Sequence, residues 1–142
     1  MPDLTTGDLT QVLLQTPFPQ LPAIHAGSAG TPQSFAGYYL KKLEEKHCSR
    51  SQALAKSGLE VHYGYQILNG RKKPSRDKIL CLCIGGGFSI RETNQALVWA
   101  EYSPLYPRRL RDAAIMLALN QKLPTLWAVN ERLAELDLPL LG

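Results

Sequence analysis

The chain has 142 residues, of which 44% are hydrophobic and 20% charged, a composition typical of a globular protein that buries a core without disulfide bonds. Its apolar runs are only a few residues long, which excludes a transmembrane helix, and its first residues lack the basic and apolar regions of a secretory signal. The three cysteines have no C-x-x-C spacing, so we expect reduced thiols and a cytoplasmic protein.

The net charge of +4 is unevenly distributed along the chain. Residues 41–80 carry ten basic and four acidic side chains, an excess of +6, so that the rest of the chain carries −2. A basic segment in an otherwise nearly neutral chain indicates a local polyanionic partner. The alternative is an ordinary solvated helical surface.

Residues 1–33 differ in composition from the rest, with five of the ten prolines and only two charged residues, Asp3 and Asp8. Leu9, Val12 and Leu13 have helical spacing. We expect an N-terminal arm with one short helix followed by a Pro-rich linker.

The sequence of residues 34–102 predicts five helices, over 34–47, 50–57, 61–68, 76–85 and 90–101. Serines at 49, 75 and 89 are natural N-caps, and the glycines at 58, 70 and 85–87 end the helices before them. The apolar residues of the first and second helices predict inward faces, and those of the fourth predict a mostly buried helix. These residues are Phe35, Tyr39, Leu40, Leu43, Ala53, Leu54, Ile79, Leu80, Leu82, Cys83 and Ile84.

Residues 103–142 predict two further helices, over 108–120 and 125–136, which form an antiparallel pair. We expect the fifth helix to bury Ile90, Leu97 and Ala100 and the pair to bury its own apolar positions. Those positions are Leu110, Ala114, Leu117, Leu126, Val129, Leu133 and Leu136. No segment alternates like a strand over more than a few residues, so the predicted fold class is all-α.

Residues 49–74 carry the most informative pattern. Two short helices joined by a turn at Gly58 are typical of a helix-turn-helix, and the Asn69-Gly70 turn is followed by three basic residues. Together with Leu40, Leu43, Ile67 and the N-G-x-x-x-P-S segment at 69–75, this pattern resembles the lambda-repressor-like (XRE) helix-turn-helix family of bacterial transcriptional regulators. Residues 34–142 also resemble a subgroup with Gly-Tyr-Gln-Ile (64–67) and Ser-Pro-Leu-Tyr-Pro (103–107) segments.

The resemblance implies a five-helix lambda-repressor-like domain at 34–102, extended by a C-terminal helical hairpin at 103–142. It implies a regulator that binds double-stranded DNA with a recognition helix in the major groove. Gln66 would pair with adenine and Val61 would touch a thymine methyl group. The implied base-contacting residues are Val61, His62, Tyr65 and Gln66. The implied phosphate-contacting residues are Arg50, Arg71, Lys72 and Lys73.

The helix-turn-helix segment departs from the family pattern in four ways. Glu60 occupies the N-cap of the recognition helix, Gly64 replaces a core aliphatic residue, Ala53-Leu54 reverses the usual Leu-Ala order, and the recognition helix has no Arg or Lys. Tyr63 is a candidate to fill the space over Gly64. These departures support an alternative hypothesis, a helix-turn-helix-fold protein-interaction module with weak or no DNA binding.

Other chemistry has no support in the sequence. His47, Cys48, Cys81 and Cys83 do not have zinc-site spacing, and the Gly85–Gly87 run lacks the Lys-Ser/Thr of a P-loop. We therefore expect no enzyme activity, metal or cofactor. One helix-turn-helix reads few base pairs, so we expect a homodimer or a protein partner through the C-terminal helices, and no membrane partner.

Overall fold

The computed structural model describes residues 34–142, and within this range it has seven helices and no strand. The arm predicted over residues 1–33 lies outside the described part of the chain. The predicted all-α class is confirmed for the described part. The helices are α3 (Phe35–Glu45), α4 (Arg50–Ser57), α5 (Val61–Leu68), α6 (Arg76–Gly85), α7 (Ile90–Trp99), α8 (Leu110–Asn120) and α9 (Leu126–Glu135).

Serine side chains cap the starts of α4, α6 and α7, as the sequence predicted. The Ser49 and Ser89 hydroxyls accept bonds from the backbone N–H of Gln52 and Glu92, whose side chains accept the serine N–H in return. Ser75 caps α6 in the simpler one-way form. The bounds of α4, α5 and α6 agree with prediction, and each of the other helices is two or three residues shorter in total.

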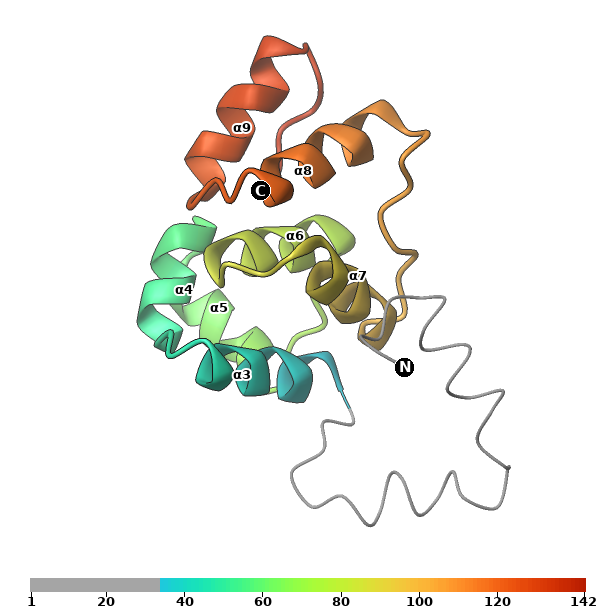
Figure 1. The fold of residues 1–142 in the computed structure, drawn as a ribbon. Coiled ribbons are helices and arrows are strands. Elements are labelled where there is room, and N and C mark those ends of the chain that lie inside the picture. The colour runs from blue at the N-terminus through green and yellow to red at the C-terminus, as the bar shows by residue number, and fades with distance from the viewer. Residues whose placement is uncertain (1–33) are drawn as a thin grey trace, which may run out of the picture.

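Helix α6 is the centre of the molecule. Its residues 79–85 are all buried, because α4, α7 and α9 pack around it (Figure 1). Cys81 and Cys83 are therefore both buried although they point to different sides of the helix. A Cβ atom on Gly85 would overlap Ser57 and the Ala53 carbonyl, so α4 and α6 touch at backbone distance.

Aromatic packing fixes α3 beneath this centre. The Tyr39 ring stacks on Phe88 with 5.1 Å between centroids and meets Phe35 at 5.6 Å. Its hydroxyl donates a 2.6 Å hydrogen bond to the Leu82 carbonyl. Burial raises the pKa of Tyr39 well above its ordinary value, so the phenol stays protonated and keeps this donor.

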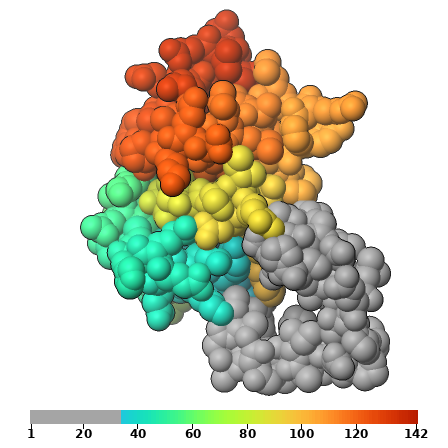
Figure 2. All heavy atoms as spheres, viewed as in Figure 1, coloured from blue at the N-terminus to red at the C-terminus, as the bar shows by residue number. Residues whose placement is uncertain are grey.

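The C-terminal helices α8 and α9 lie on the opposite side of α6 from α3, directly against the rest of the molecule (Figures 1 and 2). The predicted inward face of α8 is wrong, because Leu110 and Leu117 are 63% and 55% exposed. The buried face consists of Asp112, Ile115, Ala118 and Leu119. In α9, Leu126, Val129 and Leu133 are buried as predicted. Leu136, which was also predicted to be buried, is 51% exposed because α9 ends before it. Two further residues predicted to be buried, Ile90 of α7 and Ala114 of α8, are only half-buried.

Asp112 explains the rotation of α8, because its carboxylate is held at the start of α6. Arg76 donates two bonds to it, at 3.2 and 3.0 Å, and the Tyr106 N–H donates a third at 2.9 Å. A second, reversed pair lies beside it, in which Arg111 donates two 2.9 Å bonds to Asp77. Adjacent residues on α6 and α8 thus form two crossed ion pairs.

The last residues of the chain are held through their main chain. Arg111 donates hydrogen bonds to the carbonyls of Pro139 and Leu140, at 2.9 and 2.8 Å. The Asn130 amide group donates a hydrogen bond to the Leu141 carbonyl and accepts one from the Leu141 N–H.

Within residues 34–142, no helix combines the length and apolarity that crossing a membrane requires.

Candidate nucleic-acid interface

Glu60 starts α5, the helix that holds all four base-contacting candidates. Its carboxylate accepts the backbone N–H groups of His62 and Tyr63, at 2.7 and 3.1 Å. These bonds hold the pKa of Glu60 below its usual value. A negative charge at this end of the helix is favourable for the helix dipole, but it is unfavourable for a phosphate brought to the same place.

The exposed face of α5 carries three of the four predicted base-contacting residues. Val61 is 55% exposed, and His62 and Gln66 are also exposed. Tyr65 is half-buried and packs on the core. The helix buries Gly64, Ile67 and Leu68 against its neighbours α3 and α4.

Leu54 of α4 fills the space over Gly64, where the sequence had suggested Tyr63. A Cβ atom on Gly64 would lie 2.5 Å from Leu54 Cδ2, well inside contact distance. Tyr63 instead is half-buried with the Lys78 ammonium 6.0 Å from its ring centre. The small residue on α5 and the large one on α4 are therefore two sides of one packing contact.

The turn after α5 presents a basic surface. Gly70 has a φ of +79°, and the N–H groups of Arg71 and Lys72 both bond to the Gln66 carbonyl, at 2.9 and 3.2 Å. Arg71, Lys72 and Lys73 are exposed, with the Lys73 ammonium 5.7 Å from the Tyr102 ring centre. We call residues Arg71, Lys72 and Lys73 the basic turn.

The remaining phosphate-contacting candidate, Arg50, is the first residue of α4 and is exposed. Its placement follows from the Ser49 cap, which starts the helix there. Because α4 packs on α5, Arg50 at the start of α4 is part of the same compact unit as the candidate recognition helix α5.

Internal ion pairs use part of the positive charge counted in residues 41–80. Lys42 and Lys46 pair with Glu92, and Arg76 pairs with Asp112. Six exposed basic residues of this segment have no ion pair to another described residue, and four of them are the phosphate-contacting candidates. The six are Lys41, Arg50, Lys56, Arg71, Lys72 and Lys73.

The described part of the chain contains no group of three His, Cys, Asp or Glu side chains that could hold a metal ion. Burial raises the pKa of the Cys81 thiol to about 11, and that of Cys83 further. Both therefore remain protonated and serve as small apolar core residues.

Comparisons of the chain with models of protein families, with curated proteins and with solved structures gave no match.

Proposed function

We propose that this protein is a cytoplasmic transcriptional regulator of the lambda-repressor-like (XRE) helix-turn-helix family that binds double-stranded DNA. In this proposal α3–α7 form the five-helix domain, α4 and α5 are its helix-turn-helix, and α8 and α9 are the appended hairpin. The observation that carries the proposal is the exposed face of α5 beside a basic turn that forms no ion pair with the described residues 34–142.

In this proposal, one set of exposed residues contacts DNA phosphates and another set contacts base edges. Arg50 and the basic turn supply cations for phosphate oxygens, which position the protein without reading sequence. Gln66 supplies an amide that matches the edge of adenine, and Val61 an exposed apolar group for a thymine methyl. His62 and Tyr65 lie on the same short helix and complete the proposed reading face.

The Leu54–Gly64 contact removes one objection to this family. Leu54 fills the space over Gly64, so these two departures together leave no gap between α4 and α5. Glu60 and the absence of Arg or Lys from α5 remain, and they favour the second candidate, a protein-interaction module with weak or no DNA binding.

Titration of a fluorescent random-sequence duplex, followed by anisotropy at three salt concentrations, tests the proposal. We expect binding that weakens steeply with salt. Replacing Arg71, Lys72 and Lys73 together by Ala should reduce the slope of log K against log salt by about 0.9 for each phosphate that the variant no longer neutralises. The matched control replaces Arg108, Arg109 and Arg132 by Ala, with the same change in net charge and an unchanged slope.

The same titration decides between the two candidates. Absence of binding at low salt would reject DNA binding and leave the protein-interaction module. If the two triple variants bound equally weakly, binding would depend on net charge, and the basic turn would have no special role. Once a preferred site has been selected, Gln66→Ala should cost about 1–3 kcal/mol on that site and little on random DNA.

A further inference from the structure

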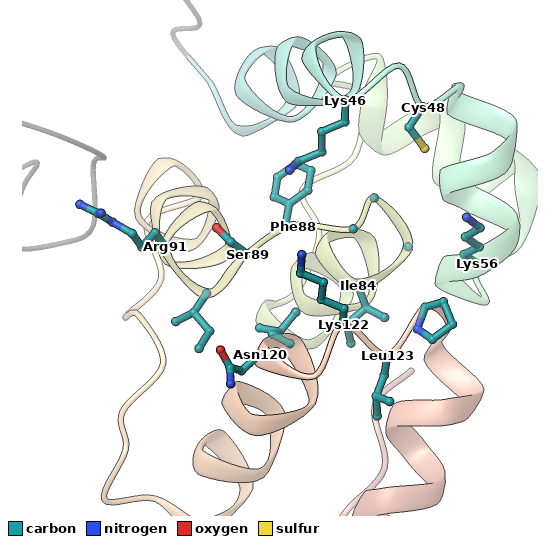
Figure 3. A pocket seen from close by; sticks show the side chains of 16 residues that line it. Lys46, Cys48, Lys56, Ile84, Phe88, Ser89, Arg91, Asn120, Lys122 and Leu123 are labelled. Carbon is teal, nitrogen blue, oxygen red and sulfur yellow. The ribbon is translucent and has the colours of Figure 1, made fainter.

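A cleft of about 680 Å³ lies on a different part of the molecule from α5. It is bounded by the ends of α3 and α4, the α6–α7 turn and the α8–α9 turn (Figure 3). The C-terminal helices thus supply one wall, and α3, α4 and the α6–α7 turn supply the other. Its volume is in the range of small-molecule sites in proteins.

Every charged residue that lines this cleft is basic. The four are Lys46, Lys56, Arg91 and Lys122. The side chains of Lys46 and Lys122 come from opposite walls and point toward each other across Phe88, whereas Arg91 points away (Figure 3). Glu92 neutralises Lys46 at 2.7 Å, but Lys56 and Lys122 have no ion pair to any residue in the range 34–142.

The rest of the cleft is predominantly apolar. Its walls include Ile84, Phe88, Leu119 and Leu123, with the glycines of the α6–α7 turn between them. At Gly85, which lines the cleft, α4 and α6 are already in backbone contact and cannot approach further. An apolar cleft with two cations that have no ion pair within residues 34–142 favours a ligand with an anionic group and an apolar body.

We propose that this cleft binds a small amphipathic anion, a carboxylate, sulfonate or phosphate group carried on an apolar body. The anionic group lies between Lys122 and Lys56, and the body packs on Phe88 and Leu123. A bound anion would join the α8–α9 turn to α4 and so stabilise the docking of the C-terminal helices. This goes beyond DNA binding and uses none of the residues assigned to it.

The test uses the full chain and the fluorescent probe anilinonaphthalenesulfonate, which joins a sulfonate to an apolar body. We expect saturable one-to-one binding that Lys122→Met and Lys56→Met each weaken by about five- to tenfold. Arg108→Met, an equally neutralising change at an exposed position outside the cleft, should leave the affinity unchanged. The uncharged phenylnaphthylamine should bind the wild type and the lysine variants equally.

Two results would overturn the proposal. One is the absence of saturable binding; the other is equal sulfonate affinity in the wild type and both lysine variants. Leu117→Ser checks that the probe does not simply coat the exposed leucines of α8, and it should have no effect. Because Lys56 and Lys122 are not assigned to DNA, their variants should bind duplex normally, which separates failure here from failure of DNA binding.

Discussion

At the residue scale, the large side chain of Leu54 on α4 packs over Gly64 on α5, which has no side chain. Leu54 is 1% exposed, and its methyl group occupies the volume that a side chain at position 64 would need. A glycine inside a helix costs about 1 kcal/mol relative to alanine. Here the steric requirement of the core outweighs that helix preference.

This contact predicts an effect of Gly64→Ala that reverses between two backgrounds. In the wild type the added methyl group should overpack the core and lower the free energy of unfolding by about 1–2 kcal/mol. In a Leu54→Ala background, itself about 2–5 kcal/mol less stable, the same change should stabilise by up to about 1 kcal/mol. Urea unfolding of the four proteins measures both, and equal effects in the two backgrounds would contradict the contact.

Asp112 is the residue on which the docking of α8 depends. An asparagine there cannot accept both Arg76 bonds and leaves the guanidinium without its counter-charge. We expect Asp112→Asn to cost about 2–3 kcal/mol in the free energy of unfolding, measured with urea. Asp137→Asn, at an exposed position after α9, is the control and should change stability little.

At the element scale, Glu60 stabilises the start of α5 as its N-cap, but its negative charge repels a DNA phosphate at that end of the helix. Glu60→Ser keeps an N-cap residue and removes the negative charge beside the proposed phosphate path. We expect its affinity for random duplex to rise about two- to fivefold at low salt and the gain to shrink as salt is added. The matched change Glu131→Ser on α9 should have no effect, and an unchanged Glu60→Ser affinity would place α5 away from phosphate.

The outer face of α8 is the element-scale candidate for self-association. Leu110 and Leu117 are seven residues apart, on one side of the helix, and both are exposed. A single helix-turn-helix reads few base pairs, so we propose a second copy of the chain as the partner of this face. Light scattering after gel filtration should show a dimer for the wild type and a monomer for the Leu110→Asp/Leu117→Asp double variant.

Val61→Asp is the control for this experiment, because Val61 is as exposed as Leu117 but lies on α5. It should remain dimeric and bind DNA more weakly. A double variant that remains dimeric would exclude the α8 face as the interface.

At the scale of the whole molecule, three carboxyl groups link stability to pH. Bonds from the N–H groups of His62 and Tyr63 lower the pKa of Glu60. Burial alone would raise the pKa of Glu92 and of Asp112, but their basic partners and backbone N–H donors outweigh it and lower both values.

Since all three pKa values are lower in the folded state, the unfolded chain binds more protons in mild acid. The stabilisation is therefore complete above the ordinary carboxyl pKa, about 4, and is lost as the pH falls through the lower folded values. Urea unfolding between pH 6 and about pH 2.5 should show this decline. Asp112→Asn should flatten it, whereas a decline unchanged in that variant would remove Asp112 as a contributor.

Local signals made much of the molecule predictable from its sequence. Serine caps set the starts of α4 and α6, glycines follow the ends of α4, α5 and α6, and the apolar residues at 79–84 predicted a mostly buried helix. The face of α8 was not predictable, because the partner of Asp112 lies 36 residues away and apolar periodicity favours Leu110 and Leu117. The cleft was also hidden, since its basic residues come from separate segments of the chain.

The way Arg111 and Asn130 hold the end of the chain has a consequence for how this protein can vary. Both side chains bond to main-chain groups of residues 139–141, so these bonds do not depend on the side chains of Pro139 and Leu140, whereas Leu141 is also buried in the core at 4% exposure. Leu140, which is 52% exposed, should therefore accept almost any replacement, whereas inserting one residue after Leu136 would move every bonded carbonyl out of position. Positions 139 and 140 are constrained by chain length and little by side chain, so related chains should differ there by substitution rather than by insertion or deletion.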